Sequence, residues 1–67
     1  MSLDTKREEA KNEFSKENFD RAKALYQELY QGSKDQWDGW GLARSLNKLG
    51  DYAKAEEISK EVYDSFS

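Results

Sequence analysis

The feature that most constrains this chain is a helix-turn-helix pattern that occurs twice, with an offset of 33 residues. The segment Gly50-Asp51-Tyr52 indicates a tight turn, because glycine can end one helix in the left-handed conformation and aspartate can cap the next. A fainter turn lies at residues 17–19. The residues that repeat at this offset are Ala10 and Ala43, Lys11 and Arg44, Phe19 and Tyr52, Ala22 and Ala55, Leu25 and Ile58, Glu28 and Glu61, Leu29 and Val62, and Tyr30 and Tyr63. Such a period is typical of stacked helical repeats.

The period and the helix formers predict an all-α chain with helices over about 3–16, 19–31, 35–49 and 52–66. We expect Gly32 to end the second helix, and the short connections make neighbouring helices antiparallel. The 67 residues form a single domain, 1–67, with one repeat-like unit at about 3–32 and a second at about 35–66. No segment alternates with the period of a strand.

The core is expected to be formed by equivalent positions of the two units. We expect the following residues to be buried: Phe19, Ala22, Leu25 and Leu29 in the first unit, and Leu46, Tyr52, Ala55 and Ile58 in the second. Gly39 and Gly41 each weaken the first turn of the third helix by about 1 kcal/mol relative to alanine. That end of the helix therefore depends on packing.

The chain resembles the tetratricopeptide repeat family over nearly all of its length. The residues in register are Ala10, Phe14, Phe19, Ala22, Tyr26 and Leu29 in the first unit, and Leu42, Ala43, Leu46, Gly50, Asp51, Tyr52, Ala55 and Val62 in the second. The resemblance implies two stacked antiparallel helix pairs with a right-handed twist, as a fragment of an α-solenoid.

Some positions depart from the family pattern. The opening tryptophan of the family falls on Gly39, with Trp40 one place later, and the closing proline is missing. Glu9 and Glu13 stand where the family prefers Leu and Tyr. Ankyrin repeats share the period but lack support here, since their Thr-Pro-Leu-His signature is absent. A plain four-helix bundle is the structural alternative.

The composition excludes several functions. Without histidine or cysteine, only carboxylates could hold a metal, and no loop of clustered acids is present, so we expect no metal and no cofactor. No serine has a histidine to activate it, and we expect no enzymatic activity. The net charge of −3 and the lack of a basic cluster argue against nucleic acid. With no membrane span and no secretory signal in the sequence, we expect a cytoplasmic protein.

The resemblance implies that the first and third helices line a concave face that binds a protein or peptide. Carried over residue by residue, the inward positions are Asp4, Arg7, Lys11, Phe14 and Ser15, and Trp37, Trp40, Arg44, Asn47 and Lys48. The candidate partner-binding residues are Arg7, Lys11, Phe14, Trp37, Trp40, Arg44, Asn47 and Lys48. Their spacing also places them on one stripe of each helix.

These stripes are basic and aromatic in an acidic chain, which suits an acidic or carboxylate-ended peptide. Each residue also has a plainer interpretation. For Trp40, a position in the core is favoured over a contact with the partner, because a small domain needs its tryptophans in the core. For Trp37, the two interpretations are equally favoured. Lys11 and Lys48 can equally be ordinary surface lysines.

The alternative function is structural. The chain ends directly after the fourth helix with no capping helix, so Ile58, Val62, Tyr63 and Phe66 are expected to face water. We expect such a fragment of a longer repeat protein to bury this face in a symmetric homodimer.

Overall fold

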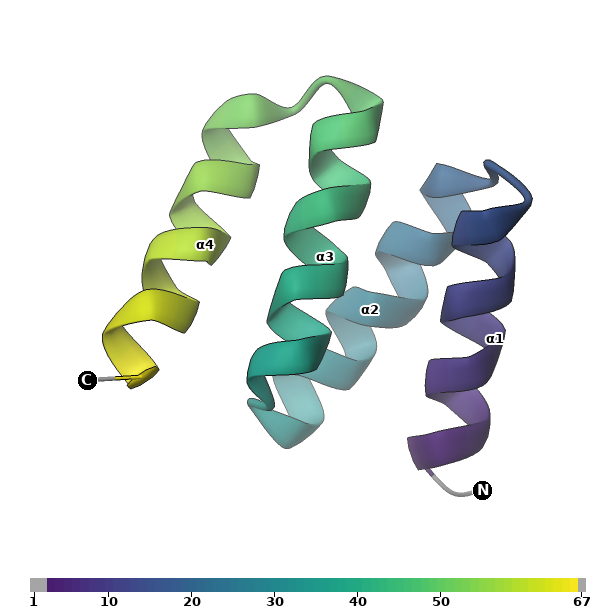
Figure 1. Cartoon of the computed structure of the whole chain (residues 1–67), viewed down its shortest axis with the longest axis horizontal. Coiled ribbons are helices and arrows are strands. Elements are labelled where there is room, and N and C mark those ends of the chain that lie inside the picture. Colours follow the sequence, from purple (N-terminus) through teal and green to yellow (C-terminus); the bar gives the residue numbers. More distant parts are fainter. Residues whose placement is uncertain (1–2, 67) are drawn as a thin grey trace.

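A computed structural model describes residues 3–66 of the chain, and the side chains of residues 4–64. It forms four α-helices joined by short turns (Figure 1). The helices are α1 (Leu3–Ser15), α2 (Phe19–Ser33), α3 (Gln36–Leu49) and α4 (Tyr52–Phe66). The predicted all-α class is confirmed, and each helix lies within two residues of its expected bounds.

Local backbone chemistry explains where α2 and α3 begin and end. Gly50 ends α3 in the left-handed conformation, with φ of 87°, as expected. The prediction that Gly32 ends α2 is wrong: the helix continues to Ser33, and Lys34 takes the left-handed position with φ of 58°. Asp35 then caps α3, because its carboxylate accepts a hydrogen bond from the Trp37 backbone N–H at 2.9 Å.

Each helix packs against the next one along the chain (Figure 1). The helix α1 also touches α3, whereas α4 packs mainly against α3 and meets α2 through the Tyr30 side chain. The result is a flat slab of 29 × 27 × 14 Å, in which α2 lies behind α1 and α3 in Figure 1. This arrangement leaves the space between α1 and α3 open on the face opposite α2.

The buried residues follow the 33-residue offset closely. All four repeated alanines, Ala10, Ala22, Ala43 and Ala55, are at most 2% exposed, as are Leu29 and Val62. The burial predicted for Ala22, Leu29, Leu46 and Ala55 is therefore confirmed, whereas Leu25 and Ile58 are only half-buried. The largest buried cluster joins α2, α3 and α4, and it consists of Tyr30, Leu42, Leu46, Ala55 and Val62, with Tyr26 and Ile58 packed against it.

Two burial expectations at the second unit are wrong. Tyr52 is 69% exposed instead of buried. Its counterpart Phe19 is half-buried because it packs edge-on against the Phe14 ring, at 5.1 Å between centroids. The position equivalent to Phe14 in the second unit is Asn47, which offers Tyr52 no ring to pack against.

The second error concerns Val62, which was expected to face water but is 1% exposed. Val62 fills the space that Gly39 leaves open on α3, since a Cβ atom at Gly39 would collide with its side chain and with the Tyr30 ring. A glycine at this position therefore lets α4 and α2 approach the same stretch of α3.

Candidate functional site

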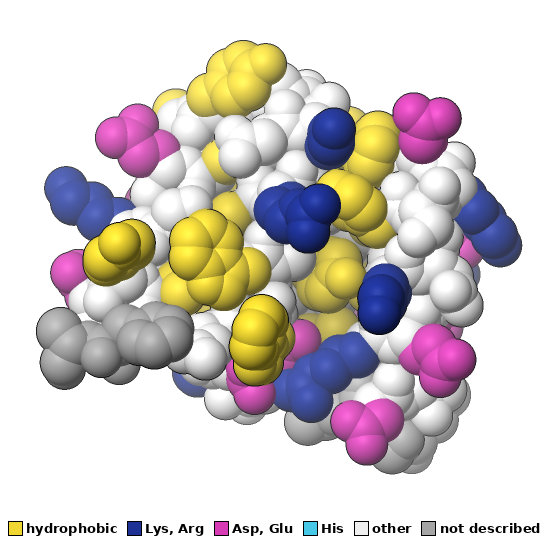
Figure 2. Space-filling view, in the orientation of Figure 1, with side chains coloured by type: hydrophobic (Ala, Val, Ile, Leu, Met, Phe, Trp, Pro, Cys, Tyr) yellow, Lys and Arg dark blue, Asp and Glu magenta, His cyan; other side chains and the backbone are white. Residues whose placement is uncertain are grey.

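A groove of about 970 Å³ lies between α1 and α3. Seven of the eight predicted partner-binding residues line it, namely Arg7, Lys11, Phe14, Trp37, Trp40, Arg44 and Lys48. The eighth, Asn47, is exposed on α3 but does not line the groove. Figure 2 shows hydrophobic and basic side chains gathered across the middle of this face, with acidic ones mostly at its margins.

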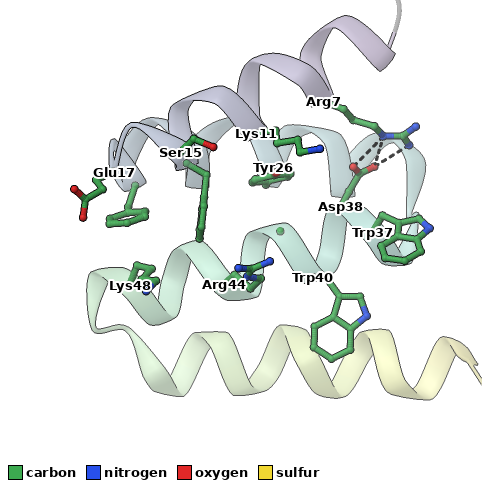
Figure 3. A pocket seen from close by; sticks show the side chains of 13 residues that line it. Arg7, Lys11, Ser15, Glu17, Tyr26, Trp37, Asp38, Trp40, Arg44 and Lys48 are labelled. Atoms are coloured by element: carbon green, nitrogen blue, oxygen red, sulfur yellow. Dashed lines mark hydrogen bonds and ion pairs between the residues drawn. The ribbon is translucent and has the colours of Figure 1, made fainter.

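The floor of the groove is supplied by α2. The Tyr26 ring lies between α1 and α3 (Figure 3) and faces Gly41, where any Cβ atom would collide with the ring. Burial raises the pKa of the Tyr26 hydroxyl above its usual value, and the nearby negative charge of Asp38 adds to this effect. Gly41 and Tyr26 together set the depth of the groove.

An aromatic pair and an arginine form the middle of the groove. The Arg44 guanidinium lies over the Phe14 ring, 5.1 Å from its centroid. Phe14 is in turn held edge-on by Phe19. The cation–π contact positions the guanidinium, while its N–H groups at the edge of the plane can still donate to an incoming acceptor.

The two tryptophans of α3 are accessible. Trp37 is 71% exposed and Trp40 is 39% exposed. Trp37 lies at the Arg7 end of the groove, and Trp40 leans toward α4 (Figure 3). The core position favoured for Trp40 is therefore wrong, because Gly39 takes the inward place next to it and Val62 fills the core there.

Arg7 forms an internal ion pair that the sequence reasoning missed. Its Nε and Nη2 atoms each donate to the Asp38 carboxylate at 3.0 Å (Figure 3). The Ser33 hydroxyl donates to the same carboxylate at 2.6 Å, and Asp38 is only 1% exposed. The hydrogen bond with Asp38 raises the pKa of the Arg7 guanidinium despite an opposing desolvation.

The remaining cations of the groove have no such partner. Lys11, Arg44 and Lys48 form no ion pair with an acid in the described part of the chain. Glu17 lies at the Lys48 end (Figure 3), and it is the one lining acid besides the paired Asp38. The groove is therefore positively charged on balance, although the chain carries a net charge of −3.

The predicted self-association residues are not a single exposed patch. Val62 is buried, Ile58 is half-buried and Tyr63 is 72% exposed. Phe66 lies outside the described side chains. Self-association itself stays a prediction.

Within the described residues, no three His, Cys, Asp or Glu side chains are grouped so that they could hold a metal ion. None of the helices described is both long and apolar enough to cross a membrane. Comparison with protein-family models, with curated proteins and with solved structures gave no match to this chain.

Proposed function

We propose that this chain is a non-catalytic protein-interaction module that binds an acidic peptide segment in the groove between α1 and α3. The observation that carries the proposal is the convergence of seven predicted residues, from two helices, on one positively charged groove. Exposed tryptophan is unusual on a small domain and is enriched at the energetic centres of protein interfaces. Arginine and lysine add attraction for carboxylates.

We also propose that the two helix pairs are tetratricopeptide-like units. The burial of all four repeated alanines supports this, because small residues at these places let paired helices approach closely. The open arrangement supports it as well. In a plain four-helix bundle the helices close around one core, whereas here α4 does not reach α1 within the described residues and the slab is 14 Å thin.

Amide chemical shifts in a two-dimensional ¹⁵N NMR spectrum test the binding proposal. The probe is an acetylated hexapeptide of leucine, serine and glutamate with a free C-terminal carboxylate. We expect its addition to shift the amides of residues 7–15 and 37–48. Shifts confined to α4, growing with protein concentration, would contradict groove binding and favour self-association through that helix.

Matched variants locate the contacts. Trp37→Ala should weaken peptide binding about tenfold or more, because a truncated tryptophan at an interface centre typically costs about 2 kcal/mol. Arg44→Gln removes a groove charge and should weaken binding about two- to fivefold. Lys60→Gln, on the exposed side of α4, removes the same charge away from the groove and should leave binding unchanged.

A further inference from the structure

We infer that the groove recognises the side-chain carboxylates of an extended segment with the pattern apolar–x–acid–x–acid, and not a free C-terminal carboxylate. The inference rests on the proposed function, because it specifies what the same groove binds. Three observations support it: which hydrogen-bond donors of the groove are free of internal partners, how these donors are spaced along α3, and the position of Glu17 at one end of the groove.

Capture of a chain terminus requires several donors that converge on one carboxylate. The groove has one arginine at its Trp37 end, and that arginine is Arg7. Two of its nitrogens already donate to Asp38 at 3.0 Å, and the same carboxylate is held by Ser33 at 2.6 Å. No convergent set of free donors remains at that end.

The free donors are instead spread along one stripe of α3. Trp40, Arg44 and Lys48 follow one another at intervals of four residues, so they share a face and are separated by about 6 Å along the helix axis. In an extended peptide, every second side chain points the same way, and these side chains are about 6.6 Å apart. A peptide that lies along α3 can therefore place one side chain on each of the three.

The chemistry at each position sets the pattern. Trp40 offers apolar surface and is 39% exposed. Arg44 lies over the Phe14 ring, 5.1 Å from its centroid, and forms no ion pair within the described residues, so it is available to a carboxylate of the peptide. Lys48 can pair with a second acid, and Lys11 adds positive charge from the α1 wall. Glu17 at the Lys48 end repels a further acid beyond that point (Figure 3).

Peptides with both ends blocked test the inference. The probe is acetyl-Gly-Leu-Ser-Glu-Ser-Glu-Gly-amide, together with its reversed sequence, because the spacing leaves the chain direction open. The comparison peptide, acetyl-Gly-Leu-Ser-Ser-Glu-Glu-Gly-amide, has the same composition but adjacent acids, of which one must point away from α3. We expect the better alternating peptide to bind about two- to fivefold tighter than the comparison peptide, as one additional exposed ion pair allows.

A free C-terminal carboxylate on the better peptide should change its affinity less than twofold. Loss of binding on amidation, or equal affinity for alternating and adjacent acids, would overturn the inference while leaving groove binding intact. If none of the peptides, blocked or free, shifts the groove amides, the proposed function fails as well.

A double-mutant cycle assigns the second acid. Lys48→Gln in the protein and Glu→Gln at the second acid of the better peptide should not be additive, because each change removes the same ion pair. Lys60→Gln serves as the control and should give additive effects with the same peptide. Additive effects for Lys48→Gln would show that the second acid does not meet Lys48, which would overturn the pattern.

Discussion

Two glycines of α3 lie where side chains from other helices approach its backbone. Gly39 faces Val62 and Tyr30 in the core, and Gly41 faces the Tyr26 ring on the floor of the groove. Each glycine costs the helix about 1 kcal/mol relative to alanine. At both positions the lost helix propensity is offset by close packing. The contact between Gly41 and Tyr26 also shapes the candidate site.

Replacement of Gly39 should therefore destabilise the protein even though alanine is the better helix former. We expect Gly39→Ala to lower the free energy of unfolding by about 1–3 kcal/mol, as overpacked cores do. The new Cβ atom would lie 2.9 Å from the nearest Tyr30 ring carbon and would also collide with Val62. Urea unfolding followed by circular dichroism at 222 nm measures the change.

Gly32→Ala is the matched control for this prediction. Nothing lies within 4 Å of a Cβ atom at Gly32, which is exposed near the end of α2. We expect this variant to be more stable by about 0.4–1 kcal/mol, because alanine restricts the unfolded chain. Equal changes in the free energy of unfolding for Gly39→Ala and Gly32→Ala would show that the close contacts at Gly39 do not determine the cost of replacing it.

The helices, their order and their pairing were predictable because of the helical spacing of apolar residues and because some boundaries have a local chemical signal. Glycine at position 50 and aspartate at position 35 stop and start helices by backbone conformation and capping. The end of α2 was predicted too early, since a glycine can also remain helical. There the helix continues past Gly32, and the Lys34 backbone N–H donates to the Tyr30 carbonyl at 2.9 Å.

The sequence predicted which residues of the two helices line the groove, but it did not predict the ion pair between Arg7 and Asp38. Helical spacing places Lys11 and Arg44 on facing helices, and the groove contains both. A lone aspartate near the start of a helix, such as Asp38, is usually solvated, so nothing in the sequence marks it as buried. Its partner Arg7 lies 31 residues away, and only tertiary packing brings the two together.

This ion pair is the main polar link between α1 and α3. We expect Asp38→Asn to lower the free energy of unfolding by about 1.5–3 kcal/mol, because the buried carboxylate accepts charge-assisted hydrogen bonds that the neutral amide replaces poorly. Hydrogen exchange should also become faster in α1, since this helix loses its tie to α3. Chemical denaturation and amide exchange by NMR provide the two measurements.

Asp4→Asn is the control for Asp38→Asn, because it removes a carboxylate that faces the same arginine from the surface. The Asp4 side chain is 92% exposed and its carboxylate lies 3.7 Å from Arg7 Nη1. We expect its replacement to change the stability by at most about 0.5 kcal/mol. A comparable loss in both variants would mean that burial of Asp38 adds nothing to the pair.

As a whole molecule, the chain is a thin slab in which one helix, α2, contributes to both the groove and the core. It sends Tyr26 to the floor of the groove and Tyr30 into the cluster with α3 and α4. Because Tyr26 also packs against that cluster, the floor of the groove is continuous with the core. A change in the ionisation of either tyrosine therefore affects the stability of the entire domain.

The stability should fall in alkaline solution for this reason. Burial is the largest cause of the raised pKa at both Tyr26 and Tyr30, and the negative charges of Asp38 and Glu61, respectively, add to it. In the unfolded chain these hydroxyls lose their protons near pH 10, while the folded protein still retains them. The folded state then binds more protons, so the free energy of unfolding decreases as the pH rises above about 10.

Substitution isolates the contribution of Tyr26 from that of the other groups in the protein. Urea unfolding of the wild type and of Tyr26→Phe at pH 8 and near pH 11 gives the loss of stability for each protein. We expect a smaller loss in Tyr26→Phe, because phenylalanine has no proton to release in either state. Since Tyr26 forms the groove floor, its ionisation in the folded protein would also place a negative charge beneath Arg44. Peptide affinity in the wild type should therefore fall only at still higher pH, above the raised pKa of Tyr26, where the folded protein loses this proton as well. An equal loss of stability in the wild type and in Tyr26→Phe would contradict the buried-tyrosine explanation.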